Sequence, residues 1–221
     1  MSTATTKKFV FKKLDDDCLL DGQLHPAIRQ RLNRIRELPL VGVANLIGVE
    51  RIDSTAQLVW EFVPGRNLEE IQAADAATWE RIAREVILAI ESLHAVGIVH
   101  GAIHERNVIV LHDGTVKLTH VSPLLWTETG NDVQDAIAML EERIAAQWPE
   151  SELAKVFKEA RLQNWALDRL YRRLHPQAPQ EVDPGKPRLR KRSLLAAALV
   201  AGMGVAVAIG VLWYFAKDAV G

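Results

Sequence analysis

The sequence predicts an α+β fold in which strands and helices form separate groups along the chain. Residues 46–52 and 57–63 are rich in β-branched and aromatic side chains, and the intervening Asp53-Ser54 suits a turn, so both segments are predicted to be strands. Residues 78–96 carry apolar side chains at the spacing of a helix that is buried along one face. This order differs from the regular alternation of strands and helices that builds a parallel sheet, and it therefore favours α+β.

The later segments continue the same pattern. Asp113-Gly114 is a strong two-residue hairpin signal, and it predicts paired strands over residues 107–112 and 115–119. Two helices are predicted to follow, one capped by Asn131 or Asp132 and one over residues 151–174.

The composition is that of a folded protein with a basic segment near its end. Of the 221 residues, 48% are hydrophobic and 25% are charged, which is typical of globular rather than disordered chains. Residues 186–221 contain six basic residues and one acidic residue, which gives them a formal charge of +5. Because the whole chain has a formal net charge of −1, residues 1–185 carry −6. An acidic body argues against nucleic-acid binding, which usually needs a basic face. Cys18 is the only cysteine, which excludes an intramolecular disulfide and a cysteine-based zinc site.

The C-terminal region is predicted to contain a transmembrane helix over residues 193–216. The 23 residues 194–216 include no charged or strongly polar side chain, and a helix of that length spans a bilayer core of about 30 Å. The basic residues before it are expected to stay on the cytoplasmic side. The expected organisation is a cytoplasmic domain over 1–175, a proline-rich and basic juxtamembrane linker over 176–192, the tail-anchoring single-pass helix, and a short extracytoplasmic tail over 217–221.

Small side chains recur at every fourth position of that predicted helix. They are Ala198, Gly202, Ala206 and Gly210. Such a stripe lets a second helix approach closely, so self-association through it is one expected contact, besides contact with the lipid bilayer. Alanine and glycine are also frequent throughout this segment, and the stripe therefore has an alternative explanation in composition alone.

The motifs between residues 40 and 147 resemble those of the protein-kinase-like fold in order and spacing. His100-Gly-Ala-Ile-His-Glu-Arg-Asn107 has the spacing of the kinase catalytic loop, H-R-D-x-x-x-x-N, and it is equally similar to the H-G-D-x-H-x-x-N loop of aminoglycoside-phosphotransferase-like relatives. Three other segments resemble kinase elements: 58–65 the strand and hinge between lobes, 116–122 the strand leading to D-F-G, and 131–133 the start of the central helix. The resemblance implies a two-lobed fold with an abbreviated N-lobe and a truncated C-lobe.

The resemblance also indicates that the catalytic groups of a kinase are missing. Phosphoryl transfer needs metal ions, positioned phosphates and a carboxylate that orients the acceptor hydroxyl. Ala102 stands where the loop carboxylate should be, and its methyl group cannot accept a proton. His120 stands at the metal-binding Asp of D-F-G, although Mg²⁺ prefers oxygen ligands. Asn107 matches the metal-side asparagine, but a structural hydrogen bond that closes the loop is the favoured explanation.

The nucleotide-binding side of the predicted site is also incomplete. No glycine-rich loop precedes Lys12, which is a weak candidate for the phosphate-binding lysine and is otherwise a solvated residue of an edge strand. The partner glutamate should lie within 26–37, where Glu37 is the only carboxylate. Four arginines occupy that segment: Arg29, Arg31, Arg34 and Arg36. No cofactor is therefore expected.

Histidine side chains are candidate metal ligands. His100 and His104 are four residues apart, but the loop resemblance places them outside a helix, and a role for His100 in bracing the loop is favoured. A cluster of His104, His112 and His120 is conceivable if the hairpin brings them together. No metal site is predicted.

The function expected from these features is that of a membrane-anchored, catalytically inactive pseudokinase. It would act as a protein-interaction scaffold or assembly factor at the cytoplasmic membrane face, with protein partners in a membrane complex and without nucleic acid. One alternative is a structural subunit of a larger membrane complex. The other is an atypical nucleotide-binding phosphotransferase, which would need Glu105 or Asp113 in place of the missing carboxylates.

Overall fold

The structure is a computed structural model that describes residues 7–53, 55–125 and 129–176. These residues belong to one compact unit. The predicted transmembrane helix, the small-residue stripe, the C-terminal tail and nearly all of the juxtamembrane linker lie outside the described residues. The localisation that was expected from them stays a prediction.

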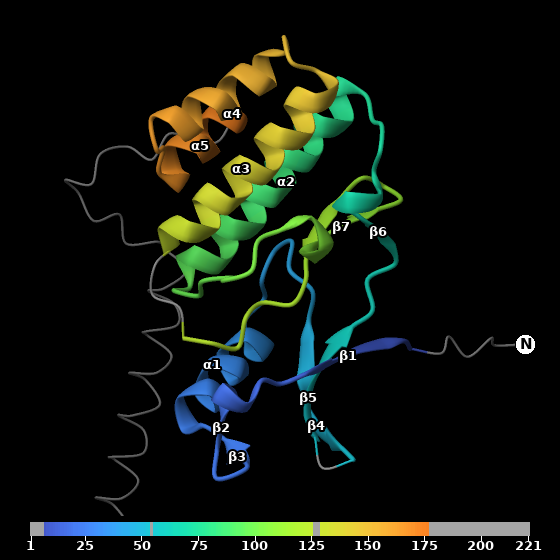
Figure 1. Cartoon of the computed structure of the whole chain (residues 1–221), viewed down its shortest axis with the longest axis vertical. Coiled ribbons are helices and arrows are strands. Elements are labelled where there is room, and N and C mark those ends of the chain that lie inside the picture. Colours follow the sequence, from blue (N-terminus) through green and yellow to red (C-terminus); the bar gives the residue numbers. More distant parts are fainter. Residues whose placement is uncertain (1–6, 54, 126–128, 177–221) are drawn as a thin grey trace, which may run out of the picture. The chain divides into compact units, whose positions relative to one another are not determined.

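The N-terminal part of the fold is an antiparallel sheet of three strands in the order β1-β5-β4 (Figure 1). These strands are β1 (Phe9–Lys13), β4 (Leu46–Ile52) and β5 (Thr55–Glu61). Both predicted strands are therefore confirmed, although the second begins two residues earlier than the sequence suggests. Asp53 has a φ of +48°, a conformation that lets Thr55 pair directly with Ile52 across a tight turn.

Between β1 and β4 the chain forms a short hairpin and a helix. The hairpin consists of β2 (Leu19–Leu20) and β3 (Gln23–Leu24), and it follows a single turn of helix, η1 (Asp16–Cys18). Helix α1 spans Pro26–Glu37, with proline at its first position, where the missing N–H has no helical partner in any case. The side chain of His25 caps this helix by accepting a hydrogen bond from the backbone N–H of Ala27.

A second antiparallel sheet has the order β6-β7-β8. The predicted hairpin is confirmed as β7 (Val108–Leu111) and β8 (Val116–Leu118). Strand β6 (Gly65–Asn67) was missed, because three residues are too few to produce a periodic pattern. Gly65 is required there, since a Cβ atom at this position would lie 2.5 Å from the carbonyl oxygen of Val110 on the neighbouring strand.

Four helices form a group in which one packs against β8 of this second sheet and the others pack on neighbouring helices (Figure 1). They are α2 (Ala76–Ala95), α3 (Thr129–Gln147), α4 (Glu152–Leu162) and α5 (Leu167–Leu174), and short 3-10 turns η2 (Leu68–Glu70) and η3 (Glu105–Asn107) precede α2 and β7. The helix predicted over 78–96 is confirmed as α2. The cap predicted at Asn131 or Asp132 is wrong, because α3 begins at Thr129 and Asp132 is completely buried inside its first turns.

The single helix predicted over 151–174 is also wrong, because two helices occupy that range. Asn164 adopts a φ of +49° after α4 ends. The backbone N–H of Trp165 then donates to the oxygen of Ala160 at 2.9 Å, and that of Asn164 donates to Arg161 at 3.2 Å. These two bonds form a Schellman motif, which terminates a helix and satisfies its last carbonyl groups. Asparagine tolerates this backbone conformation better than most residues, which explains the break.

The predicted fold therefore needs a correction. The described part of the chain is α+β with five α-helices, and none of these is long and apolar enough to cross a membrane. The two predicted lobes are not clearly separated either, because one hydrophobic cluster runs from Leu14 and Ile35 beside the first sheet to Trp79 and Phe157 among the helices.

Candidate functional site

The loop over residues 98–107 connects α2 to the second sheet, and a buried carboxylate fixes its backbone. One oxygen of Asp132 accepts the backbone N–H of His100 at 2.7 Å and the other accepts that of Gly101 at 2.8 Å, and His94 Nε2 lies 2.9 Å from the first. Gly101 has a φ of +71°, which turns both N–H groups toward the carboxylate. Burial alone would raise the pKa of Asp132, but these hydrogen bonds hold it below its usual range.

His100 is fully buried at the start of the loop. Its Nε2 lies 3.1 Å from the backbone oxygen of Thr119, and its own backbone oxygen accepts the N–H of Ser122 at 2.8 Å. Burial lowers the pKa of His100 to about 4, so the imidazole is neutral near pH 7 and Nε2 is the protonated nitrogen that donates to Thr119. The structure thus places His100 as a link between the loop and the segment that follows β8.

Asn107 lies at the centre of the predicted catalytic positions. Its side-chain Nδ2 donates to the backbone oxygen of Ala102 at 2.9 Å and lies 2.9 Å from His104 Nε2. Its Oδ1 lies 3.1 Å from His120 Nδ1. All three contacts are satisfied together when His104 accepts at Nε2 and His120 donates from Nδ1. The amide of Asn107 therefore joins two other predicted site positions, Ala102 and His120, and also His104 into one hydrogen-bonded group.

His120 has an unusual backbone conformation, with a φ of +60°. Its ring also packs edge-on against Trp60, with 6.3 Å between ring centroids. The pKa of His120 is lowered by burial, and then by the positive charge of Lys12 and by His104. Burial and Lys12 also lower the pKa of His104. Lys12 is exposed on β1 and is close enough to influence both histidines electrostatically.

Helix α1 contacts the loop through arginines, which the sequence did not predict. Arg31 is 8% exposed, and its guanidinium donates to the backbone oxygens of Ser122 and Val99. Arg34 donates to the backbone oxygen of Val96 in the same way. Glu37, the carboxylate considered as a partner for Lys12, pairs instead with Arg36 at 3.6 Å. The helix is therefore held against the loop by donated hydrogen bonds rather than by a lysine–glutamate pair.

An ion pair joins β8 to β5 near the site. The ammonium group of Lys117 contacts one oxygen of Glu61, and Asn45 Nδ2 donates to the other at 2.7 Å. Burial would raise the pKa of Glu61, but the hydrogen bonds from Lys117 and Asn45 lower it below its usual range. No sequence signal identifies this pair, because its members are 56 residues apart.

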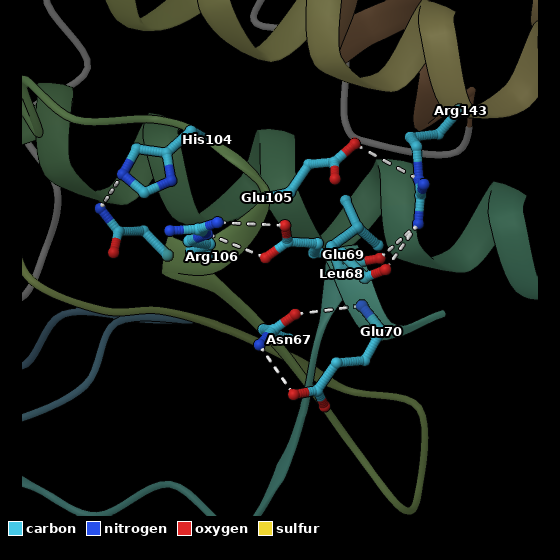
Figure 2. A network of polar contacts seen from close by, with 9 residues as sticks. Asn67, Leu68, Glu69, Glu70, His104, Glu105, Arg106 and Arg143 are labelled. Atoms are coloured by element: carbon cyan, nitrogen blue, oxygen red, sulfur yellow. Dashed lines mark hydrogen bonds and ion pairs between the residues drawn. The ribbon is translucent and has the colours of Figure 1, made fainter. Parts of the chain in front are cut away.

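The outer side of the loop carries a network of ion pairs (Figure 2). Arg106 makes two contacts to Glu69, at 2.9 Å and 3.3 Å, and Glu105 lies 3.4 Å from Arg143 Nε. The same guanidinium of Arg143 donates to the backbone oxygens of Leu68, Glu69 and Ile71. Glu105, one of the two candidate carboxylates for an atypical phosphotransferase, is thus engaged in holding η3 to α3.

Asp113, the other of those two carboxylates, lies in the hairpin turn. Its Oδ1 accepts a hydrogen bond from the backbone N–H of Thr115 at 2.9 Å and another from the hydroxyl of Thr115 at 2.7 Å. The three-histidine cluster does not form within the described ranges, which contain no group of three residues that could hold a metal ion. His104 and His120 both contact Asn107, whereas His112 lies in the hairpin turn after β7.

These features agree with a relationship to protein kinases, which sequence comparisons support. No family model matches the chain. It is 31% identical over 88 residues to the serine/threonine-protein kinase pak-2 of Caenorhabditis elegans, which covers 38% of this chain and 17% of that protein. It is 28% identical over 112 residues to a probable serine/threonine-protein kinase of Clostridium perfringens, covering 49% of this chain and 16% of the other. A probable serine/threonine protein kinase of Arabidopsis thaliana, IREH1, is 38% identical over 66 residues, covering 28% of this chain and 5% of its own.

The similarity is partial in both directions. The chain spans 17% or less of the length of these relatives, and the matched segments cover less than half of the chain in each case. The comparisons thus support a kinase-like relationship, whereas activity and partners remain to be proposed from the site itself.

Proposed function

We propose that this chain is a kinase-like module without phosphotransferase activity that acts by binding a protein partner. The observation that carries the proposal is the state of Asn107, whose side-chain oxygen contacts His120 and whose nitrogen contacts Ala102 and His104. In kinases this asparagine holds a metal ion. Here its oxygen is already used by an imidazole, and the neighbouring ligand position offers nitrogen in place of a carboxylate.

The position of Ala102 supports the same conclusion. It contributes only its backbone oxygen to the site, as an acceptor for Asn107. A catalytic loop that orients an acceptor hydroxyl needs a carboxylate at this position, and a methyl group supplies neither charge nor a hydrogen bond. Among the described residues, Glu105 and Asp113 are each committed to other contacts and therefore do not replace it.

The helix that should complete a nucleotide site has a different role here. Arg31 lies on α1, where an active kinase would present a glutamate toward the phosphate-binding lysine. A positively charged guanidinium cannot replace that glutamate as a partner for lysine, and the guanidinium of Arg31 holds the backbone oxygens of Ser122 and Val99 instead. The groups that hold the backbone of the loop are retained. A binding module requires a fixed loop, whereas catalysis alone does not explain why only these groups remain.

Thermal unfolding of the full chain with ATP or ADP, with and without Mg²⁺, tests this proposal. We expect no shift of the unfolding temperature and no phosphate transfer to a generic protein substrate. A site occupied at 100 times its dissociation constant would stabilise the fold by about 2.7 kcal/mol, a shift of several degrees. A Mg²⁺-dependent shift together with phosphate transfer would refute the proposal.

A double variant provides the matched comparison. Ala102→Asp with His120→Asp restores both carboxylates without altering the rest of the loop. A Mg²⁺-dependent nucleotide shift that is gained by this variant and missing in the natural chain would assign the loss of binding to these two positions.

A further inference from the structure

Strand β1 has an unpaired edge. The sheet order β1-β5-β4 places β1 at one side, and no other strand of the described residues pairs with it. The N–H of Leu14 donates to Ala56 at 2.9 Å and that of Phe62 donates to Lys8 at 3.2 Å. In an antiparallel ladder the backbone groups alternate in direction. The even-numbered residues of β1 therefore face β5, and the N–H and C=O groups of Phe9, Phe11 and Lys13 point away from the sheet.

The side chains along this edge are apolar and basic. Phe9 and Phe11 are 43% and 47% exposed. Lysine occupies positions 7, 8, 12 and 13, and no acidic residue lies between them, although the body of the protein is acidic overall. The charge changes sign immediately after the strand, where Asp15, Asp16 and Asp17 follow. The basic edge is therefore short and bounded at one end by acidic residues.

We propose that this edge binds an extended, acidic segment of a partner protein, which adds to the sheet as a fourth strand. The inference rests on the proposed binding function and specifies the surface that performs it. Backbone hydrogen bonds to Phe9, Phe11 and Lys13 supply affinity, and apolar residues of the incoming strand pack on the two phenylalanines. Acidic residues opposite 7–13 are attracted, whereas acidic residues opposite 15–17 are repelled, so the charge pattern sets the register of the added strand.

A second copy of this chain is disfavoured as the occupant of the edge. Pairing two β1 strands would bring two lysine-rich segments together, and like charges across a strand pair are destabilising. Lysine on an edge also discourages self-association of sheets in general. A partner with the opposite charge has no such penalty.

The direct test is binding of a fluorescent peptide of about ten residues that alternates glutamate with valine, titrated with the full chain and followed by anisotropy. We expect saturable binding that weakens as salt is raised, because exposed charges contribute to it. A peptide with lysine in place of glutamate is the control, and it should bind at least about tenfold more weakly.

Two substitutions locate the contact on β1. Phe11→Pro removes an N–H that points away from β5, so it should abolish peptide binding and retain the existing sheet. Phe11→Ala keeps that N–H and should retain weakened binding. Lys12 lies on the opposite face of β1 from Phe9 and Phe11, where the glutamates of the peptide lie when its valines pack on the phenylalanines. Lys12→Glu should therefore reduce affinity by about tenfold, whereas Lys158→Glu, at an exposed lysine on α4, should leave it unchanged. If Phe11→Pro lowers the unfolding temperature markedly, peptide binding by the two lysine variants decides whether the contact lies on β1.

The outcomes separate cleanly. Failure of the glutamate peptide to bind, equal binding of the lysine peptide, or binding that survives both Phe11→Pro and Lys12→Glu would overturn the inference. A concentration-dependent dimer that Phe11→Pro abolishes would show that a second copy occupies the edge, which also overturns it. Neither result bears on nucleotide binding, so the proposed lack of phosphotransferase activity is judged separately.

Discussion

The two sides of the loop over 98–107 differ in what their side chains do. On the inner side, Asp132 accepts hydrogen bonds from the backbone of His100 and Gly101, and Arg31 donates to the backbone oxygen of Val99. On the open side, Ala102 and His120 occupy the two positions at which the proposed function places the lost carboxylates. The groups that fix the loop are present, and neither residue 102 nor residue 120 is acidic. We infer from this contrast that the backbone of the loop is stabilised by groups other than the side chains at positions 102 and 120. Substitutions on each side test this inference.

The largest effect is expected at Asp132. Asp132→Ala leaves the buried N–H groups of His100 and Gly101 without an acceptor, and it should lower the free energy of unfolding by about 3–5 kcal/mol. Asp132→Asn keeps one acceptor oxygen and should lose less. Urea unfolding measures both. The control is Asp135→Asn on the same helix: burial and the charge of Asp132 raise the pKa of Asp135, so removing its charge should cost nothing. Equal losses at the two positions would contradict the role assigned to Asp132.

The second effect depends on pH. His100 has a pKa of about 4 in the folded protein because of its burial, compared with about 6.5 in an unfolded chain. Between these values the unfolded state binds more protons, so the free energy of unfolding should fall by about 3 kcal/mol as pH is lowered from 6.5 to 4. The pKa values of His104 and His120 are lowered as well and contribute in the same direction.

Variants separate the histidines in that experiment. His100→Gln should flatten the pH dependence more than His120→Gln, because His100 is fully buried and His120 is only partly buried. Urea unfolding at several pH values between 7.5 and 4.5 gives the comparison, and this window lies above the range in which Asp132 titrates. An unchanged pH dependence in His100→Gln would show that the buried imidazole is not its source.

Much of the fold follows from local patterns in the sequence, and the rest depends on contacts between distant residues. Helix α2 and the β7–β8 hairpin were predicted because an apolar stripe and an Asp-Gly turn act within a few residues. The prediction of Asp132 as a helix cap is wrong because its actual partner, His100, lies 32 residues away in the sequence and approaches it only in the folded structure. The break at Asn164 depends on one residue in an unusual conformation, which periodicity does not detect.

The candidate site divides in the same way. Ala102, Asn107 and His120 could be placed together from the spacing of a known loop, and the structure brings all three into contact through Asn107. Arg31 was noticed only as the wrong charge for a lysine partner. Its actual role depends on backbone oxygens 68 and 91 residues away, and backbone groups carry no sequence signal.

A moderate effect is expected for Arg31, which belongs to the inner side. Arg31→Met keeps much of the apolar stem and removes the hydrogen bonds to Val99 and Ser122, so it should lower the free energy of unfolding by about 2–3 kcal/mol. Arg29→Met on the exposed face of the same helix is the matched control and should change stability by less than about 0.5 kcal/mol. Hydrogen exchange of the loop amides should accelerate in Arg31→Met alone. Equal stability of the two variants would remove α1 from the set of elements that fix the loop.

The smallest effect is expected at His120, on the open side of the loop. This position tests most directly whether the two sides of the loop differ in their contribution to stability. The φ of +60° at this position is tolerated by asparagine and is unfavourable for β-branched residues. His120→Asn should therefore change the free energy of unfolding by less than about 1 kcal/mol, because relief of backbone strain offsets the loss of the contacts to Asn107 and Trp60. His120→Val should lose about 1–2 kcal/mol more than His120→Asn, measured by urea unfolding, since it adds strain to the same loss of contacts. If His120→Asn instead destabilises the fold as strongly as Asp132→Ala does, the histidine is itself part of what fixes the loop, and the distinction between the two sides fails.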